Sequence, residues 1–294
     1  MLKKRTSQDV LLDIFVYTVI VLVNIVMIYP FVNIIVVSLS RAEYVVAGLV
    51  TIFPRGFNLS AYTAALSDPL MGRGYVNTLI YASTGTLLTL TITMITAYAL
   101  SVRKFRGRNF FIVYMAVTMY FSGGLIPYYL LVKSLNMIDT IWAMILPGVS
   151  VWYIIVCRTY FQSTIQDSLR ESALIDGAND LKILTHIYIP LAKPIIATLG
   201  LWSVVAQWNS WFNALIFLND IKLYPLQMVV RKVLIMYQPS SKMRSLVYSL
   251  RHLGVNEQTV RCAVIIITIL PIVMIYPFIQ KYFVKGVMVG ALKG

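Results

Sequence analysis

The residues best suited to specific chemistry lie in one polar stretch, 167–190, of an otherwise apolar chain. It holds four of the eleven acidic residues: Asp167, Glu171, Asp176 and Asp180. Carboxylates set among short polar and apolar residues favour ion pairs with basic groups of another protein. The stretch is therefore predicted to be a contact element.

The local pattern predicts a helix, a sharp turn and a second helix. The first helix covers Glu171–Gly177, and Gly177 ends it because glycine accepts the left-handed conformation without steric cost. Asn179 or Asp180 then offers a side-chain oxygen as the N-cap of a second helix, Leu181–Ile189. Pro190 marks the approach to the next apolar run.

Patterns for other kinds of chemistry are missing. No glycine is followed five positions later by Gly-Lys, so the sequence predicts no nucleotide site and no cofactor in this chain. The two histidines and two cysteines do not have metal-ligand spacing, and no Ser/His/Asp set is suggested. We therefore expect neither a metal site nor an enzyme.

Composition indicates the environment. Of 294 residues, 59% are hydrophobic and only 12% are charged, against about 25% charged in soluble domains. Runs without charge, each about 18 residues or longer, are long enough to cross a hydrocarbon core of about 30 Å. We expect a single all-α membrane domain over 1–294, with six spans near 14–40, 75–102, 109–132, 140–158, 194–219 and 261–281.

Basic residues set the expected orientation. The short loop Arg103–Arg108 carries four basic residues and no acidic one, so it is predicted to be cytoplasmic, like the basic N-terminus. Both termini and the stretch 167–190, between spans 4 and 5, then lie inside, and the loop 220–260 lies outside. The net charge of +14 is spread over loops and span ends, which favours contact with lipid headgroups rather than with nucleic acid.

The predicted spans contain no ionisable residue away from their ends. Ion- and proton-coupled carriers usually keep such residues at membrane depth. A transported solute would then be driven by a partner subunit. Sodium coupling through backbone carbonyls, which needs no charged residue, stays open as an alternative. A secondary carrier and a membrane scaffold that transports nothing also stay open as alternatives.

The residue spacing within 167–190 points to a particular protein family. Glu171, Ala173, Gly177, Ile187 and Pro190 stand at the positions of the "EAA" loop, and the stretch resembles that loop in permease subunits of ABC importers. Ser172 stands where alanine is usual and Ile189 where leucine is usual, and both changes conserve size or polarity class. The competing reading is a capped helical hairpin without a partner.

The resemblance extends over nearly the whole chain. The segments 53–59, 207–209 and 282–294 are similar to the second permease subunit of carbohydrate importers of the maltose type. Within this group the chain looks most similar to permeases for complex oligosaccharides, including alginate oligosaccharides. The expected substrate is thus an oligosaccharide. The more specific prediction is an acidic oligosaccharide, such as alginate oligosaccharide.

This resemblance implies roles and partners. The helix Glu171–Gly177 would be the coupling helix, which docks on an ATPase subunit through Glu171, Ser172, Ala173, Asp176, Gly177 and Ala178. Two such ATPase subunits would hold ATP and Mg²⁺. A homologous second permease subunit would complete the pathway, and an extracytoplasmic substrate-binding protein would dock on the outer loop.

Two further sets of residues bear on the substrate. Polar and aromatic residues in spans 3 and 5 are candidates for the pathway: Tyr120, Gln207, Trp208, Asn209, Trp211 and Asn213. Interhelical hydrogen bonding and packing explain such residues equally well. The outer loop together with the first residue of span 6, residues 220–261, carries seven basic residues, among them Arg231, Lys232, Lys242, Arg244, Arg251 and Arg261. They suit either an acidic ligand or an acidic face of the binding protein.

Overall fold

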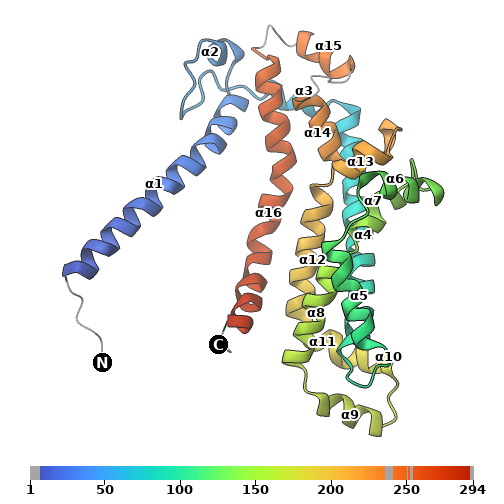
Figure 1. Cartoon of the computed structure of the whole chain (residues 1–294). Helices are drawn as coiled ribbons and strands as arrows, with labels where there is room; N and C mark the ends of the chain where they lie inside the picture. The colour runs from blue at the N-terminus through green and yellow to red at the C-terminus, as the bar shows by residue number, and fades with distance from the viewer. Residues whose placement is uncertain (1–6, 236–240, 250, 252–253, 292–294) are drawn as a thin grey trace. The chain divides into compact units, whose positions relative to one another are not determined.

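The computed structural model describes residues 7–235, 241–249, 251 and 254–291, and the regular structure in these residues is helical (Figure 1). The predicted all-α class is confirmed for them. They form two compact units, residues 1–68 with 237–269 and residues 69–236 with 270–294. Among the described residues, four helices are long and apolar enough to cross a membrane, or up to six if each of two bent helix pairs is one span.

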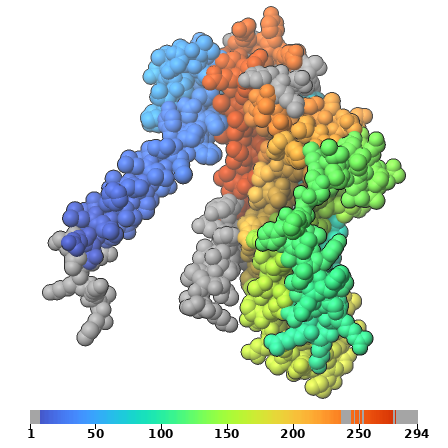
Figure 2. Space-filling model, in the orientation of Figure 1, coloured from blue at the N-terminus to red at the C-terminus, as the bar shows by residue number. Residues whose placement is uncertain are grey.

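The first unit begins with the long helix α1, Ser7–Ser38, which contains Pro30. Its apolar side chains between Val10 and Phe31 are exposed almost without exception. On the face seen in Figure 2 they are uncovered along the helix. An exposed apolar helix of this length is stable only where lipid or another protein covers it, and this fits a membrane span.

Short helices and loops follow α1 in the first unit. They are α2 (Ala42–Val46), α3 (Ser60–Leu66), α15 (Ser241–Ser249) and the start of α16 (Glu257–Ala291). Ser38 Oγ lies 2.7 Å from the Tyr62 hydroxyl, and Ala42 N donates to the carbonyl oxygen of Gly254 at 2.8 Å. Reciprocal hydrogen bonds between Asn256 and Thr259 cap α16.

The second unit is built around α4, Pro69–Ser101. α8 (Val151–Thr164), α12 (Lys193–Trp208) and α14 (Leu226–Leu234) all pack on it. The buried side of α4 is rich in glycine, alanine and threonine. Such small side chains let helix backbones approach closely, which makes α4 the natural centre of a membrane bundle.

A bend interrupts the predicted third span, whose sequence contains Gly123, Gly124 and Pro127, residue types that break helices. α5 (Arg108–Tyr120) and α6 (Leu125–Ser134) meet at 117°. Gly124 has φ +85°, a left-handed conformation that residues with a Cβ seldom adopt. Beyond α6 the chain forms α7 (Trp142–Ile145) and a 3₁₀ turn, η1 (Leu146–Gly148), before α8.

The predicted range 194–219 contains two helices. α12 ends at Trp208, and α13 (Phe212–Phe217) starts after a three-residue break. Asn209 Nδ2 donates to the carbonyl oxygen of Val205 at 3.0 Å. Asparagine side chains compete in this way for backbone hydrogen bonds and so favour helix ends.

Side chains from distant segments hold the loop after α13. Asp139 accepts hydrogen bonds from Asn219 Nδ2 at 3.0 Å and from Asp220 N at 2.9 Å, and these donors hold the pKa of its carboxyl below the usual value. Asn77 and Tyr81 of α4 donate to carbonyl oxygens around η3 (Ile221–Leu223). This end of the second unit is thus closed by polar contacts.

Candidate functional site

The polar stretch forms a helical hairpin, and its first helix is longer than predicted. α9 spans Asp167–Ile175, so the predicted start at Glu171 is wrong by four residues. The helix begins after Gln166, which is extended, and Asp167 lies in the first turn. A carboxylate is favourable there because it faces the unpaired N–H groups of the helix terminus.

Gly177 makes the turn, as predicted. Its φ is +77°, Gly177 N donates to the Leu174 carbonyl oxygen at 3.1 Å, and Ala178 N donates to the Ala173 carbonyl oxygen at 2.9 Å. This pair of bonds is a complete Schellman motif. A Cβ on Gly177 would have no atom of the described residues within 4 Å, so the backbone conformation selects glycine.

The second helix is more irregular than expected. Asn179 is its N-cap, with Oδ1 accepting from Lys182 N at 2.8 Å, so the structure selects it over Asp180. α10 (Asp180–Ile183) passes into the π-helix η2 (Leu184–Tyr188) and then α11 (Ile189–Leu191), in place of a regular helix to Ile189. Pro190 explains the irregularity, because it has no N–H to donate and its ring crowds the preceding turn.

A three-residue polar contact anchors the hairpin to α4. Asp180 Oδ1 accepts from the Tyr98 hydroxyl at 2.6 Å and from Arg170 Nη2 at 2.9 Å. Asp167 also pairs with Arg103, at 3.0 Å, just beyond the end of α4. Sequence reasoning missed these contacts, because residues 82 positions apart give no local signal. The opposite charges of Arg170 and Asp180, both within the predicted element, were the sequence signal that could have indicated this contact.

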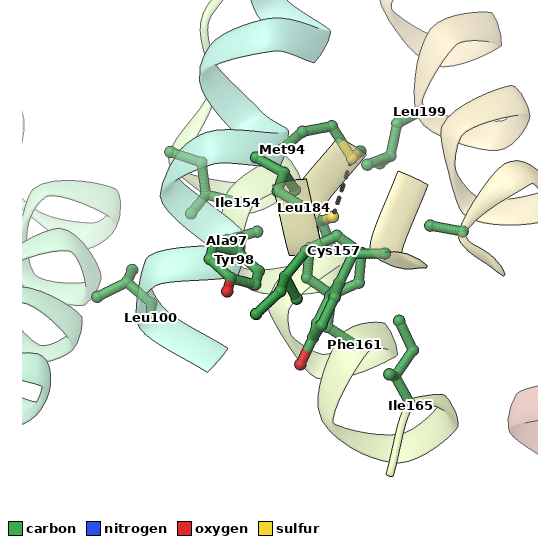
Figure 3. Close-up of a cluster of buried hydrophobic side chains, with 13 residues drawn as sticks. Met94, Ala97, Tyr98, Leu100, Ile154, Cys157, Phe161, Ile165, Leu184 and Leu199 are labelled. Carbon is green, nitrogen blue, oxygen red and sulfur yellow. Dashed lines mark hydrogen bonds between the residues drawn. The ribbon is translucent and has the colours of Figure 1, made fainter. Parts of the chain in front are cut away.

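The inner face of the hairpin packs on a buried cluster (Figure 3). Ala173 and Ala178 both rest against this cluster, in which the Tyr98 and Phe161 rings meet Tyr188 edge to face. Small side chains at these two positions let the turn approach closely. Ala173 and Ala178, predicted as contact residues for an ATPase, thus point at least partly inward.

The outer face remains without partners in the described part of the chain. The carboxylates of Glu171 and Asp176 are exposed and make no hydrogen bond or ion pair there. Beside them the apolar side chains of Leu174 and Ile175 are exposed, Ile175 by 86%. Ser172 lines a groove of about 340 Å³ with Leu169, Gln166 and Leu191. Exposed acids beside exposed apolar groups suit protein docking.

The predicted pathway residues fall into two environments. Tyr120, at the end of α5, is 83% exposed, Asn209 is exposed and Asn213 is partly buried. Trp211 is covered on one side by the Arg231 guanidinium, 4.0 Å from its ring centroid. Gln207 is buried, and Trp208 is buried with its ring edge to face with Tyr75.

We searched the described residues for side chains that could bind a metal ion. Within the described ranges, no group of three or more histidine, cysteine, aspartate or glutamate side chains could hold a metal ion. Cys157 is buried in the cluster of Figure 3, with Sγ 3.8 Å from Met94 Sδ. It acts there as a small packing residue.

The comparisons with known proteins identify the family. The family described as "Binding-protein-dependent transport system inner membrane component" matches residues 2–289. The chain belongs to this family. It is therefore a multi-pass membrane component of such a transport system rather than its ATPase, and the predicted resemblance to importer permeases is confirmed.

Individual relatives match over nearly their whole length. The Bacillus subtilis "Polygalacturonan/rhamnogalacturonan transport system permease protein YtcP" is 35% identical over 97% of this chain and 99% of its own. The "Trehalose/maltose transport system permease protein MalG" of Thermococcus litoralis is 29% identical over 98% and 99%. A chain of "a bacterial ABC transporter involved in the import of the acidic polysaccharide alginate" superposes with a TM-score of 0.91, at 33% identity over 96% and 99%.

Proposed function

We propose that this permease imports an acidic oligosaccharide and that the hairpin α9–α10 receives the driving force from an ATPase subunit. The observation that carries the second part is the outer face of the hairpin, where exposed carboxylates and Ile175 have no partner among the described residues. An element that is packed on one face and exposed on the other is suited to transmit a movement from a docked protein.

The proposed topology follows the predicted one. Six spans place both termini and the hairpin on the cytoplasmic side, where ATP is available. The basic loop 103–108 supports this orientation, and it also supplies Arg103, which pairs with Asp167 of α9. The hairpin and this loop therefore belong to the same side of the membrane.

The proposed assembly has the permease paired with a homologous permease subunit, two ATPase subunits that bind ATP and Mg²⁺, and an extracytoplasmic binding protein. Glu171 and Asp176 would pair with basic residues of the ATPase, while Leu174 and Ile175 would enter an apolar groove on it. Ser172 and its groove would widen the contact. Gly177 would fix the angle between the two helices.

The acidic substrate is supported by two kinds of observation. Polygalacturonan and alginate, named for two similar proteins, are built from uronate sugars, which carry a carboxylate on each ring. The outer segment of this chain is rich in arginine and lysine. Arg231 and Lys232 lie over the rings of Trp211 and Tyr224, whereas the side chains of Arg244 and Arg251 are exposed. Lys242 lies outside the described side chains.

The burial of each side chain limits which of the predicted pathway residues could contact a sugar in this conformation. Tyr120, Asn209 and Asn213 are open to solvent at least in part and keep the role of sugar-facing residues. Trp211 is partly buried, with Arg231 over its ring and Phe212 edge to face with it, and it keeps the role of a stacking residue. Gln207 and Trp208 would first have to be uncovered before they touch a sugar.

Charge reversal at Glu171 tests the coupling proposal. Glu171→Lys should release the ATPase during co-purification of the complex from membranes, because it places a cation where a carboxylate is proposed to meet a basic residue. We expect at least a tenfold loss of bound ATPase. Lys133→Glu is the matched control, since it reverses an exposed charge in the last turn of α6. Equal ATPase retention in both variants would refute the proposed contact.

A further inference from the structure

A row of buried hydroxyl groups lies along α4. Thr86, Thr89 and Thr93 are spaced by three and four residues and therefore share one face of the helix. Each is almost fully buried, and the three hydroxyl oxygens have no hydrogen-bond partner in the described part of the chain. Buried polar atoms are normally paired, so three in one row need an explanation.

Exposed hydroxyls on the same helix behave differently. Ser83, Thr84 and Thr91 each donate to the carbonyl oxygen four residues earlier, with Ser83 at 2.7 Å and Thr91 at 2.8 Å. This local bond is the usual way for serine and threonine to be satisfied in a helix. The buried threonines do not make it.

Gln207 of α12 lies against this row. A Cβ on Gly85 of α4 would come within 2.7 Å of Gln207 Nε2, and a Cβ on Gly148 of η1 would collide with the same atom. The Gln207 side chain thus fills a slot that exists only because both residues are glycines. It is 5% exposed, and its Nε2 has no hydrogen-bond partner in the described residues.

The polar row has a counterpart on α12. Ser203 and Gln207 are four residues apart and share a face with Leu199, which belongs to the cluster between α4, α8 and α12. Ser203 Oγ is likewise buried without a partner in the described ranges. Among the described residues, the most extensive helix packing of the second unit, between α4 and α12, therefore contains polar groups on both helices that make no hydrogen bond.

α12 is also the helix that continues the hairpin. α11 ends at Leu191, Ala192 separates it from α12, and the segment Asp180–Leu191 meets α12 at a bend of 82°. Ala192 is fully buried in the cluster, so the elbow is packed rather than loose. A displacement of α9 and α10 therefore reaches α12 through a continuous, well-packed chain.

We propose that Gln207 is a positioning residue of the transport cycle, which leaves the glycine slot and bonds the α4 hydroxyls when α12 moves along α4. This inference rests on the proposed function. Successive hydroxyls of the row are about 4.5–6 Å apart along the helix axis. That matches a one-turn shift of about 5.4 Å, a known kind of two-state packing change. The row would supply the bonds of the second state, which this conformation leaves unmade.

Valine substitutions test the idea, because valine keeps the shape of threonine and removes the hydroxyl. The triple variant Thr86→Val, Thr89→Val, Thr93→Val is purified as the full complex and reconstituted in proteoliposomes. Transported substrate per ATP hydrolysed should fall at least tenfold, while the thermal midpoint of the resting complex is unchanged or higher. Gln207→Leu, which fits the slot without an amide, should have the same effect.

The control variant is Ser83→Ala, Thr84→Val, Thr91→Val, on the exposed side of the same helix, and its transport per ATP should stay within twofold of wild type. Wild-type transport per ATP in the buried triple variant would overturn the inference. So would a fall of transport in step with the thermal midpoint, because the hydroxyls would then serve the resting structure. A wild-type complex that assembles but does not transport would instead contradict the proposed function.

Discussion

Gly177 shows what a single residue contributes to the hairpin. Its left-handed backbone closes both hydrogen bonds of the turn, yet an added Cβ would contact none of the residues that the structure describes. The requirement for glycine is therefore conformational and not steric. An L-residue with a Cβ costs roughly 1–2 kcal/mol in this conformation, and asparagine costs less than alanine or valine.

This argument predicts a graded series. Gly177→Asn should weaken ATPase binding least, Gly177→Ala more and Gly177→Val most, because β-branching adds to the backbone strain. The thermal midpoint of the complex and the affinity for the ATPase, measured by titration, should fall in that order.

Gly72 provides the control. It lies in the first turn of α4, has no atom within 4 Å of a Cβ and has no left-handed φ. Gly72→Ala should therefore be neutral or stabilise the complex by up to about 1 kcal/mol. A Gly177 series without any order, or one in which Ala matches wild type, would show that the turn is not held in this conformation in the assembled complex.

The hairpin as an element is joined to α4 by Tyr98, Arg170 and Asp180. Tyr98→Phe removes the hydroxyl that donates to Asp180 and leaves the ring packing with Tyr188 intact. We expect a loss of roughly 1–3 kcal/mol, since Asp180 then loses a short hydrogen bond. Amide hydrogen exchange should become faster over 167–183, with little change elsewhere.

Tyr114→Phe on α5 is the matched variant, because that hydroxyl makes no hydrogen bond in the described structure and its ring is exposed. It should leave exchange over 167–183 unchanged. If Tyr98→Phe also leaves that exchange unchanged, the polar anchor does not hold the hairpin.

The sequence allowed local features of these elements to be predicted, and tertiary ones only in part. Gly123 and Gly124 marked the bend between α5 and α6, and Gly177 and Asn179 marked the turn, because backbone preferences act within a few residues. The break after Trp208 was missed because Asn209 and Ser210 sit within an apolar run. The slot for Gln207 was beyond reach, since Gly85 and Gly148 meet it only in the folded unit.

At the scale of the whole molecule, the proposed function makes the chain a permease that depends on partner subunits for its energy. The family places it in the membrane component of a binding-protein-dependent system. We propose that its hairpin is a docking face, and α12 continues from this hairpin into the packed centre of the second unit. Uptake should therefore depend on ATP on the side of the hairpin and on the binding protein on the opposite side.

The most direct test is uptake of a labelled uronate oligosaccharide by proteoliposomes that contain the full complex, with ATP and Mg²⁺ trapped in the lumen and the binding protein outside. We predict accumulation with ATP, none with a non-hydrolysable analogue, and none with Glu171→Lys. A neutral oligosaccharide of equal length should be accumulated at least tenfold more slowly. Uptake that is driven by an ion gradient and proceeds equally well without ATP would contradict the account.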